Sequence, residues 1–114
     1  MTIMAKSSEH NDWLPPQAVI ALAKLGSDLA LARVRRNESL RAWAKRLNVS
    51  VSTLQRMESG DPGVGMGVYL AALWVIGRSG ALETLARPIA DRGALEVELR
   101  KLEGKLPKTK VRHG

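Results

Sequence analysis

The side chains in this sequence that could do chemistry lie close together between Val51 and Arg56. The amide of Gln55 can hydrogen-bond adenine at two points, the guanidinium of Arg56 can do the same with guanine, and the hydroxyl of Ser52 suits either base. Val51 offers methyl groups that can touch the methyl group of thymine. If a helix presents these four residues on an outward edge, they are candidates for direct contacts to DNA bases.

No group of residues in the sequence points to catalysis or to metal binding. The two histidines, His10 and His113, fall near the chain ends, and the chain contains no cysteine. No serine or carboxylate has a histidine in a supporting position, and the acidic residues are scattered singly rather than paired. We therefore expect a protein that is not an enzyme and that holds no cofactor and no metal.

Two short helices are expected to position the candidate base contacts. Leu40, Trp43, Ala44 and Leu47 recur at the spacing i, i+3, i+4 and i+7, which predicts a helix with one apolar stripe. Asn48 then suits the left-handed conformation that ends a helix and reverses the chain.

Ser50 is the expected N-cap of the second helix, which should end near Gly60. Leu54 and Met57 are spaced to point inward, so the polar edge of this helix faces outward. Two short helices joined by a tight turn, the second one with small polar side chains, predict a helix-turn-helix that enters a DNA major groove. Four residues at the helix starts are candidates for phosphate contacts: Leu40, Arg41, Ser50 and Thr53.

Residues 15–36, which precede these helices, also show helical periodicity. Two prolines suit the first turn of a helix. Gly26 could interrupt the helix, and Ser27 could then cap a second one. The sequence leaves open whether residues 15–36 form one helix or two.

The charge of the chain favours a polyanionic partner. The net charge is +7, and the fourteen residues from Arg33 to Arg46 hold six basic side chains against one acidic one, a local charge of +5. A basic surface attracts nucleic acids, although a run of charges is also typical of an ordinary solvated helix surface.

The length of 114 residues fits one domain with tails. We expect a flexible tail over residues 1–14, a DNA-binding domain over residues 15–88, and an amphipathic helix with a basic tail over residues 89–114. The start of the chain lacks the pattern of a signal peptide, and the longest apolar run, 68–76, is too short to cross a membrane. These features predict a cytoplasmic protein with no membrane partner, and DNA binding would associate it with the nucleoid.

Residues 25–76 resemble the Xre-type helix-turn-helix proteins, a family that includes the Cro/CI phage repressors. The resemblance rests on "LARVRR", on "SLRAWAKRLNVSVSTLQRMESG", and on the small Ala44 at the helix crossing. It implies an all-α, five-helix lambda-repressor-like domain that binds DNA sequence-specifically. Trp43 departs from the usual leucine of the family, and Asn48 departs from the usual glycine. The alternative is a helical hairpin in an unrelated bundle.

The resemblance also implies a structural ion pair between Arg33 and Glu58. A local reason supports it, because Glu58 would lie at a helix C-terminus, where the helix dipole disfavours a negative charge. A cation from another element would compensate that charge.

The segment "GDPGVGMGVYLAALWVIG" is similar to the matching part of HipB-like antitoxins, which are Xre proteins encoded beside a HipA-like kinase toxin. Its helix is apolar on nearly every side, so a face containing Val68, Ala72 and Val75 is expected to meet a second copy of the chain or a partner protein. The alternative is a central core helix that is covered by the domain itself.

The C-terminal part carries a narrow seam of leucines on a charged helix that should stop near Gly104. This seam could lie in a groove on the body of the protein or on a partner. The basic residues that follow could attract DNA phosphates or have no role. The seam consists of Leu95, Leu99, Leu102 and Leu106, of which the first three are candidate interface residues.

Taken together, the sequence predicts a homodimeric repressor that binds a two-fold related double-stranded DNA operator. The resemblance adds the role of an antitoxin that represses its own operon and neutralises a HipA-like toxin. The alternatives are a stand-alone Xre-type or phage-like repressor without a toxin, and an adaptor that has kept the fold but lost DNA binding.

Overall fold

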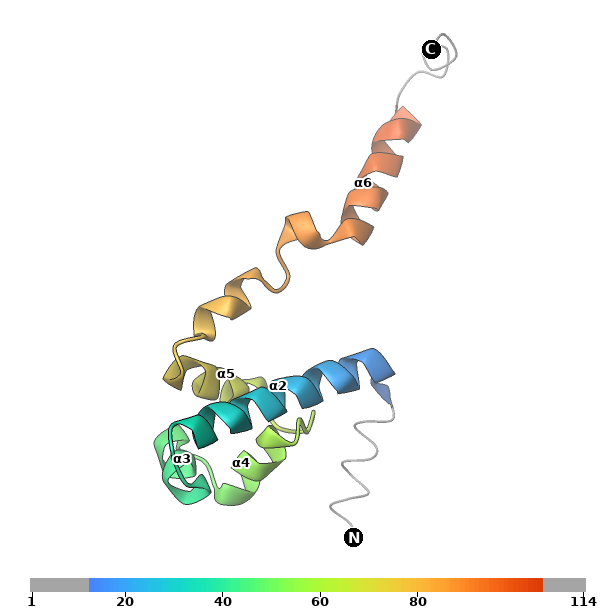
Figure 1. The fold of residues 1–114 in the computed structure, drawn as a ribbon. Coiled ribbons are helices and arrows are strands. Elements are labelled where there is room, and N and C mark those ends of the chain that lie inside the picture. Colours follow the sequence, from blue (N-terminus) through green and yellow to red (C-terminus); the bar gives the residue numbers. More distant parts are fainter. Residues whose placement is uncertain (1–12, 106–114) are drawn as a thin grey trace. The chain divides into compact units, whose positions relative to one another are not determined.

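The computed structural model describes residues 13–105, and within this range the chain forms helices and turns without a β-strand (Figure 1). The predicted all-α class is therefore confirmed. The chain divides into two compact units between Ser79 and Gly80, ahead of the expected boundary at residues 88 and 89. In the described part of the chain, none of the helices is both long enough and apolar enough to span a lipid bilayer.

The first helix of the described range, α2, runs without a break over Pro16–Arg35. Pro16 occupies the first helical position, where its missing N–H is not needed and its fixed φ suits the helix. The open question of one helix or two is thus answered: Gly26 does not interrupt α2, and Ser27 lies inside it rather than capping a new helix. The chain turns after α2 at Asn37, which has a positive φ of 58°.

The next two helices, α3 (Leu40–Leu47) and α4 (Val51–Glu58), form the expected helix-turn-helix. Asn48 takes the left-handed conformation with φ 59° and ψ 43°, as its residue type predicts. The side chain of Ser39 accepts the N–H of Ala42, and the side chain of Ser50 accepts the N–H of Thr53, so both helices begin at a serine N-cap.

The core of the first unit forms where these helices meet α5 (Met66–Val75). Helix α2 packs against α4, α4 against α3, and α3 against α5 (Figure 1). Of the predicted five-helix domain, the part that the structure describes contains the four α-helices α2 to α5. The largest side chains at the centre are at most 2% exposed: Leu29, Trp43, Leu54 and Met57.

One predicted interface residue belongs instead to this core. Ala72 is 0% exposed, and it is buried together with Tyr69 and Leu73 on the inner side of α5. Because nearly every residue of α5 is apolar, its hydrophobic pattern could not show which face turns inward. Val68 and Val75 lie at the edge of the buried side and are half-buried.

Gly26 allows α2 and the end of α4 to approach each other. A Cβ atom at Gly26 would lie 2.6 Å from the carbonyl oxygen of Met57, 2.7 Å from the nitrogen of Gly60 and 2.8 Å from the carbonyl oxygen of Glu58. These are backbone atoms, so a side chain at position 26 could be accommodated only if the two helices moved apart.

The second unit contains the end of a 3-10 helix, η1 (Ser79–Thr84), followed by η2 (Pro88–Ala90) and the helix α6 (Arg92–Lys105). Helix α6 has no buried residue. Three leucines of the predicted seam lie on it, whereas Leu106 and the basic tail that follows it lie outside the described residues. The expected N-terminal tail lies outside them as well, apart from its last two residues.

The contact at Gly26 gives a direct test of how tightly α2 holds α4. Gly26→Ala should lower the free energy of unfolding by about 2 kcal/mol or more, because overpacking against backbone outweighs the roughly 1 kcal/mol gain in helix propensity. For a domain of this size, thermal unfolding measured by circular dichroism should shift downward by roughly 10 °C.

The matched control is Gly67→Ala in α5, where an added Cβ meets no atom within 4 Å. Its stability should stay within about 1 kcal/mol of the wild type, on the stabilising side. Equal stabilities for the two alanine variants would contradict the close approach.

Candidate nucleic-acid interface

Helix α4 has one fully buried side and one exposed edge. Leu54 and Met57 are both 0% exposed and attach the helix to the core. Val51, Ser52 and Gln55 are exposed on the opposite side. The helix thus offers an apolar methyl surface, a hydroxyl and an amide to solvent, which are three of the four side chains that the sequence predicted to be outward. The fourth, Arg56, is half-buried.

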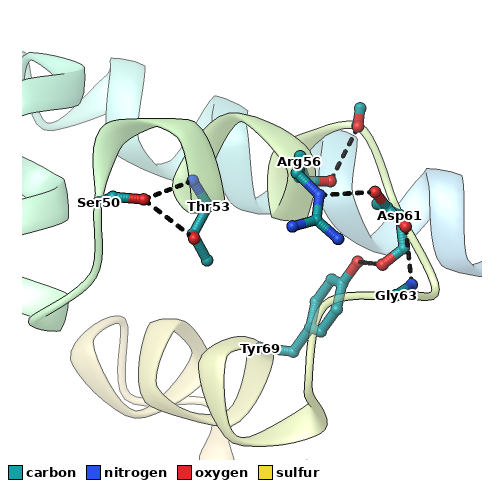
Figure 2. A network of polar contacts seen from close by, with 7 residues as sticks. Ser50, Thr53, Arg56, Asp61, Gly63 and Tyr69 are labelled. Carbon is teal, nitrogen blue, oxygen red and sulfur yellow. Dashed lines mark hydrogen bonds and ion pairs between the residues drawn. The ribbon is translucent and has the colours of Figure 1, made fainter. Parts of the chain in front are cut away.

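The residues predicted to contact phosphates all lie in the first turns of α3 and α4. Arg41 is exposed and Leu40 is half-buried at the start of α3, while Ser50 and Thr53 lie at the start of α4. The Ser50 hydroxyl accepts the N–H of Thr53 and donates to its Oγ1, both at 3.0 Å (Figure 2). Helix N-termini carry a partial positive charge and N–H groups without intrahelical partners, so two such ends can attract phosphate oxygens.

The ion pair expected between Arg33 and Glu58 is present and connects α2 to α4. Arg33 Nε donates to Glu58 Oε2 at 2.8 Å and Nη2 donates to Glu58 Oε1 at 3.1 Å, so the contact is bidentate. The third donor, Nη1, bonds the carbonyl oxygen of Glu38 at 2.9 Å. The two charged side chains are 13% and 10% exposed, and the hydrogen bond to Glu58 raises the pKa of Arg33. Arg33 is therefore a structural residue and not part of the exposed basic surface.

The remaining basic run is divided between internal contacts and open surface. Arg46 forms an ion pair with Glu38 at 3.5 Å, and its guanidinium carbon lies 5.5 Å from the centre of the Trp43 ring. Arg41 and Lys45 are exposed on α3. Of the six basic residues between Arg33 and Arg46, only Arg33 is not exposed, so the predicted basic surface loses one charge.

The sequence did not predict the network at the end of α4, shown in Figure 2. Arg56 Nε donates to Asp61 Oδ2 at 2.8 Å, and Tyr69 Oη donates to the carbonyl oxygen of Asp61 at 2.9 Å. Asp61 Oδ1 also accepts the N–H of Gly63 at 2.7 Å. The Asp-Pro-Gly turn was a readable signal for an aspartate that bonds its own loop. Nothing local indicated that Arg56 and Tyr69 would meet there.

An exposed apolar line runs along α5. Met66, Leu70 and Trp74 follow one another at a spacing of four residues and are 71%, 38% and 71% exposed. Two hollows are each lined in part by Ala71 and Trp74, the first also by Val75 and the second also by Leu70. In the second unit, the three candidate interface leucines of α6 are also exposed: Leu95 at 37%, Leu99 at 59% and Leu102 at 59%.

A protein-family model described as "Helix-turn-helix domain" matches residues 24–86, which is 63 of the 114 residues. The matched segment includes α3, the turn at Asn48 and α4. No curated protein matches the chain, and neither does any solved structure.

The environment of Tyr69 predicts an unusual titration. The pKa of Tyr69 is raised to about 12. Burial is the largest cause, the negative charge of Asp61 also raises the pKa, and the positive charge of Arg56 lowers it. The folded state therefore binds the phenol proton more tightly than the unfolded chain, whose tyrosine titrates near pH 10. The stability contributed by this neutral phenol is complete below about pH 10 and is lost as the pH rises toward 12.

Tyr69 is the only tyrosine of the chain, so tyrosinate absorbance reports on it alone. The midpoint should lie near pH 12 in the native protein and near pH 10 in denaturant. Identical midpoints in the two conditions would show that the phenol is not held in this network.

Proposed function

The chain belongs to a helix-turn-helix domain family, and on that premise we propose that it is a sequence-specific DNA-binding regulator of transcription that places α4 in the major groove. The observation that carries the proposal is the exposed edge of α4, which is fixed from behind by side chains with no exposed surface. Gln55 would contact adenine, Arg56 guanine, Ser52 either base, and Val51 a thymine methyl group. No catalytic role, cofactor or metal enters this function.

The first turns of α3 and α4 would set the position of the protein on the duplex. Leu40 and Ser50 offer backbone groups near the positive ends of the two helix dipoles, and Arg41 and Thr53 offer side chains. Contacts of this kind go to phosphates, so they fix orientation without selecting a sequence.

The regulator would act as a homodimer on a two-fold related operator. One copy of α4 reads only a half-site, and two copies related by a two-fold axis read both halves, one helical turn apart. Met66, Leu70 and Trp74 form the exposed apolar line that a second copy would cover, and the half-buried Val75 lines a hollow together with Trp74. This line replaces the face around Ala72 that the sequence suggested.

We further propose that the protein is an antitoxin in the bacterial cytoplasm, which represses its own operon and neutralises a HipA-like kinase toxin. The resemblance of the segment around α5 supports this role. Helix α6 supports it as well, because Leu95, Leu99 and Leu102 are exposed along an otherwise charged helix, and such a seam suits a groove on another protein. The alternative is a stand-alone repressor.

The roles of Gln55 and Arg41 can be separated by their DNA-binding signatures. Gln55→Ala should weaken binding to the operator by about 1–3 kcal/mol and relax the preference at one base pair, because a two-point contact to adenine is lost. Arg41→Ala should weaken binding to all sequences alike and reduce the slope of log K against log salt by about 1. Fluorescence anisotropy with operator and random duplexes measures both, after footprinting on the promoter of the gene.

Two outcomes would contradict this assignment. Equal weakening of Gln55→Ala on operator and random DNA would remove Gln55 from the base contacts. A footprint that covers a single half-site would contradict the dimer.

The antitoxin role is tested with the adjacent gene product. The full chain, co-expressed with it and purified through a tag on the partner, should form a complex, and Leu99→Glu with Leu102→Glu should abolish it because charged groups would enter the apolar seam. Binding of these variants to the operator should not change. If the adjacent gene encodes a kinase-like protein that does not bind the wild-type chain, the antitoxin role is contradicted and the stand-alone repressor is supported.

A further inference from the structure

Asp61 is held rigidly in the loop that follows α4. Its N–H donates to the carbonyl oxygen of Arg56 at 3.0 Å, and its own carbonyl oxygen accepts the Tyr69 hydroxyl at 2.9 Å. One carboxylate oxygen, Oδ1, accepts the N–H of Gly63 at 2.7 Å, and the side chain is only 9% exposed. The other carboxylate oxygen, Oδ2, therefore has a fixed place beside the last turn of α4.

The guanidinium of Arg56 is attached to this fixed point through one specific nitrogen. Its Nε donates to Asp61 Oδ2 at 2.8 Å, whereas the arginine side chain keeps 43% of its surface exposed. In Figure 2 the two terminal nitrogens of Arg56 point away from the backbone of α4, toward the side on which Tyr69 lies. A long arginine normally samples many rotamers, and anchoring Nε removes much of that freedom before any ligand binds.

The anchored geometry matches what guanine requires. Guanine presents two acceptors, O6 and N7, in the major groove, and an arginine reads both with two parallel N–H donors. We propose that Asp61 is a positioning residue, which holds Arg56 by Nε so that the terminal nitrogens face a guanine when α4 enters the groove. The inference rests on the proposed function, and it adds a specificity determinant outside the recognition helix itself.

The charge of Asp61 makes this role distinguishable from general stabilisation. A carboxylate near a DNA-binding surface repels phosphates, so its removal favours binding to any sequence. Loss of positioning acts in the opposite direction, on one base pair only. Asp61→Asn should therefore bind random DNA as tightly as the wild type or more tightly, while its discrimination at one G·C pair falls on the order of tenfold.

The experiment measures the affinity of the full chain for its operator and for duplexes in which each base pair is replaced in turn. The variants are Asp61→Asn, Arg56→Ala and the double variant. Asp28→Asn is the matched control, because Asp28 also forms an ion pair, with Lys24 at 2.7 Å, but one that is exposed on α2. Tyr69→Phe removes one support of Asp61 and should show the Asp61→Asn profile in weaker form.

The proposal requires that Asp61→Asn and Arg56→Ala relax the preference at the same G·C pair. It also requires that Asp61→Asn causes no further loss of discrimination when Arg56 is already alanine, and that Asp28→Asn leaves the base preference unchanged. The proposal would be overturned if Arg56→Ala relaxed the preference at the G·C pair and Asp61→Asn did not. It would also be overturned if Asp61→Asn sharpened that preference, because Asp61 would then keep Arg56 away from DNA. No base preference in the wild-type chain would instead overturn the proposed function. If the Asp61→Asn variant does not fold, the Tyr69→Phe variant tests the proposal instead, and an unchanged preference at the G·C pair in that variant would contradict it.

Discussion

The structure depends on how firmly α2 holds α4. Helix α4 has only eight residues, and an isolated helix of that length is not stable in water. Its rigidity must therefore come from its neighbours. Leu54 and Met57 bury its apolar side, the bidentate contact from Arg33 fixes its last turn, and Gly26 lets the two backbones approach. With these contacts in place, poor helix formers on the outer edge are tolerated.

Local patterns in the sequence were enough to predict the helix-turn-helix, but not the contacts that complete it. The serine cap and the left-handed Asn48 are properties of neighbouring residues, so their types alone indicated them. The role of Gly26 could not be predicted in this way. A single glycine within a helical pattern is found both where a helix is interrupted and where another backbone packs closely against the helix. The inner face of α5, with Ala72, could not be read from a helix that is apolar on nearly all sides. The contact between Arg56 and Asp61 depends on the path of the loop after α4, which brings Asp61 back beside the last turn of that helix.

On the polar side of the molecule, α4 is held by buried contacts while the side chains of its outer edge stay exposed. Side chains held in one geometry lose little freedom when DNA binds, and the free energy of their contacts is then available for discrimination between sequences. The exposed apolar line on α5 and the exposed leucines of α6 share no residue with the outer edge of α4. The proposed DNA contacts and the proposed protein contacts therefore involve different residues.

The most direct test of the account observes the outer edge of α4 in the complex with DNA. The chain has two glutamines, Gln55 on that edge and Gln17 in the first turn of α2, so their side-chain amide signals can be followed separately by NMR. On addition of the operator duplex, the Gln55 amide should shift and show contacts to base protons, while the Gln17 amide should remain unchanged. A saturated complex in which the Gln55 signals do not move would contradict the placement of α4 in the major groove.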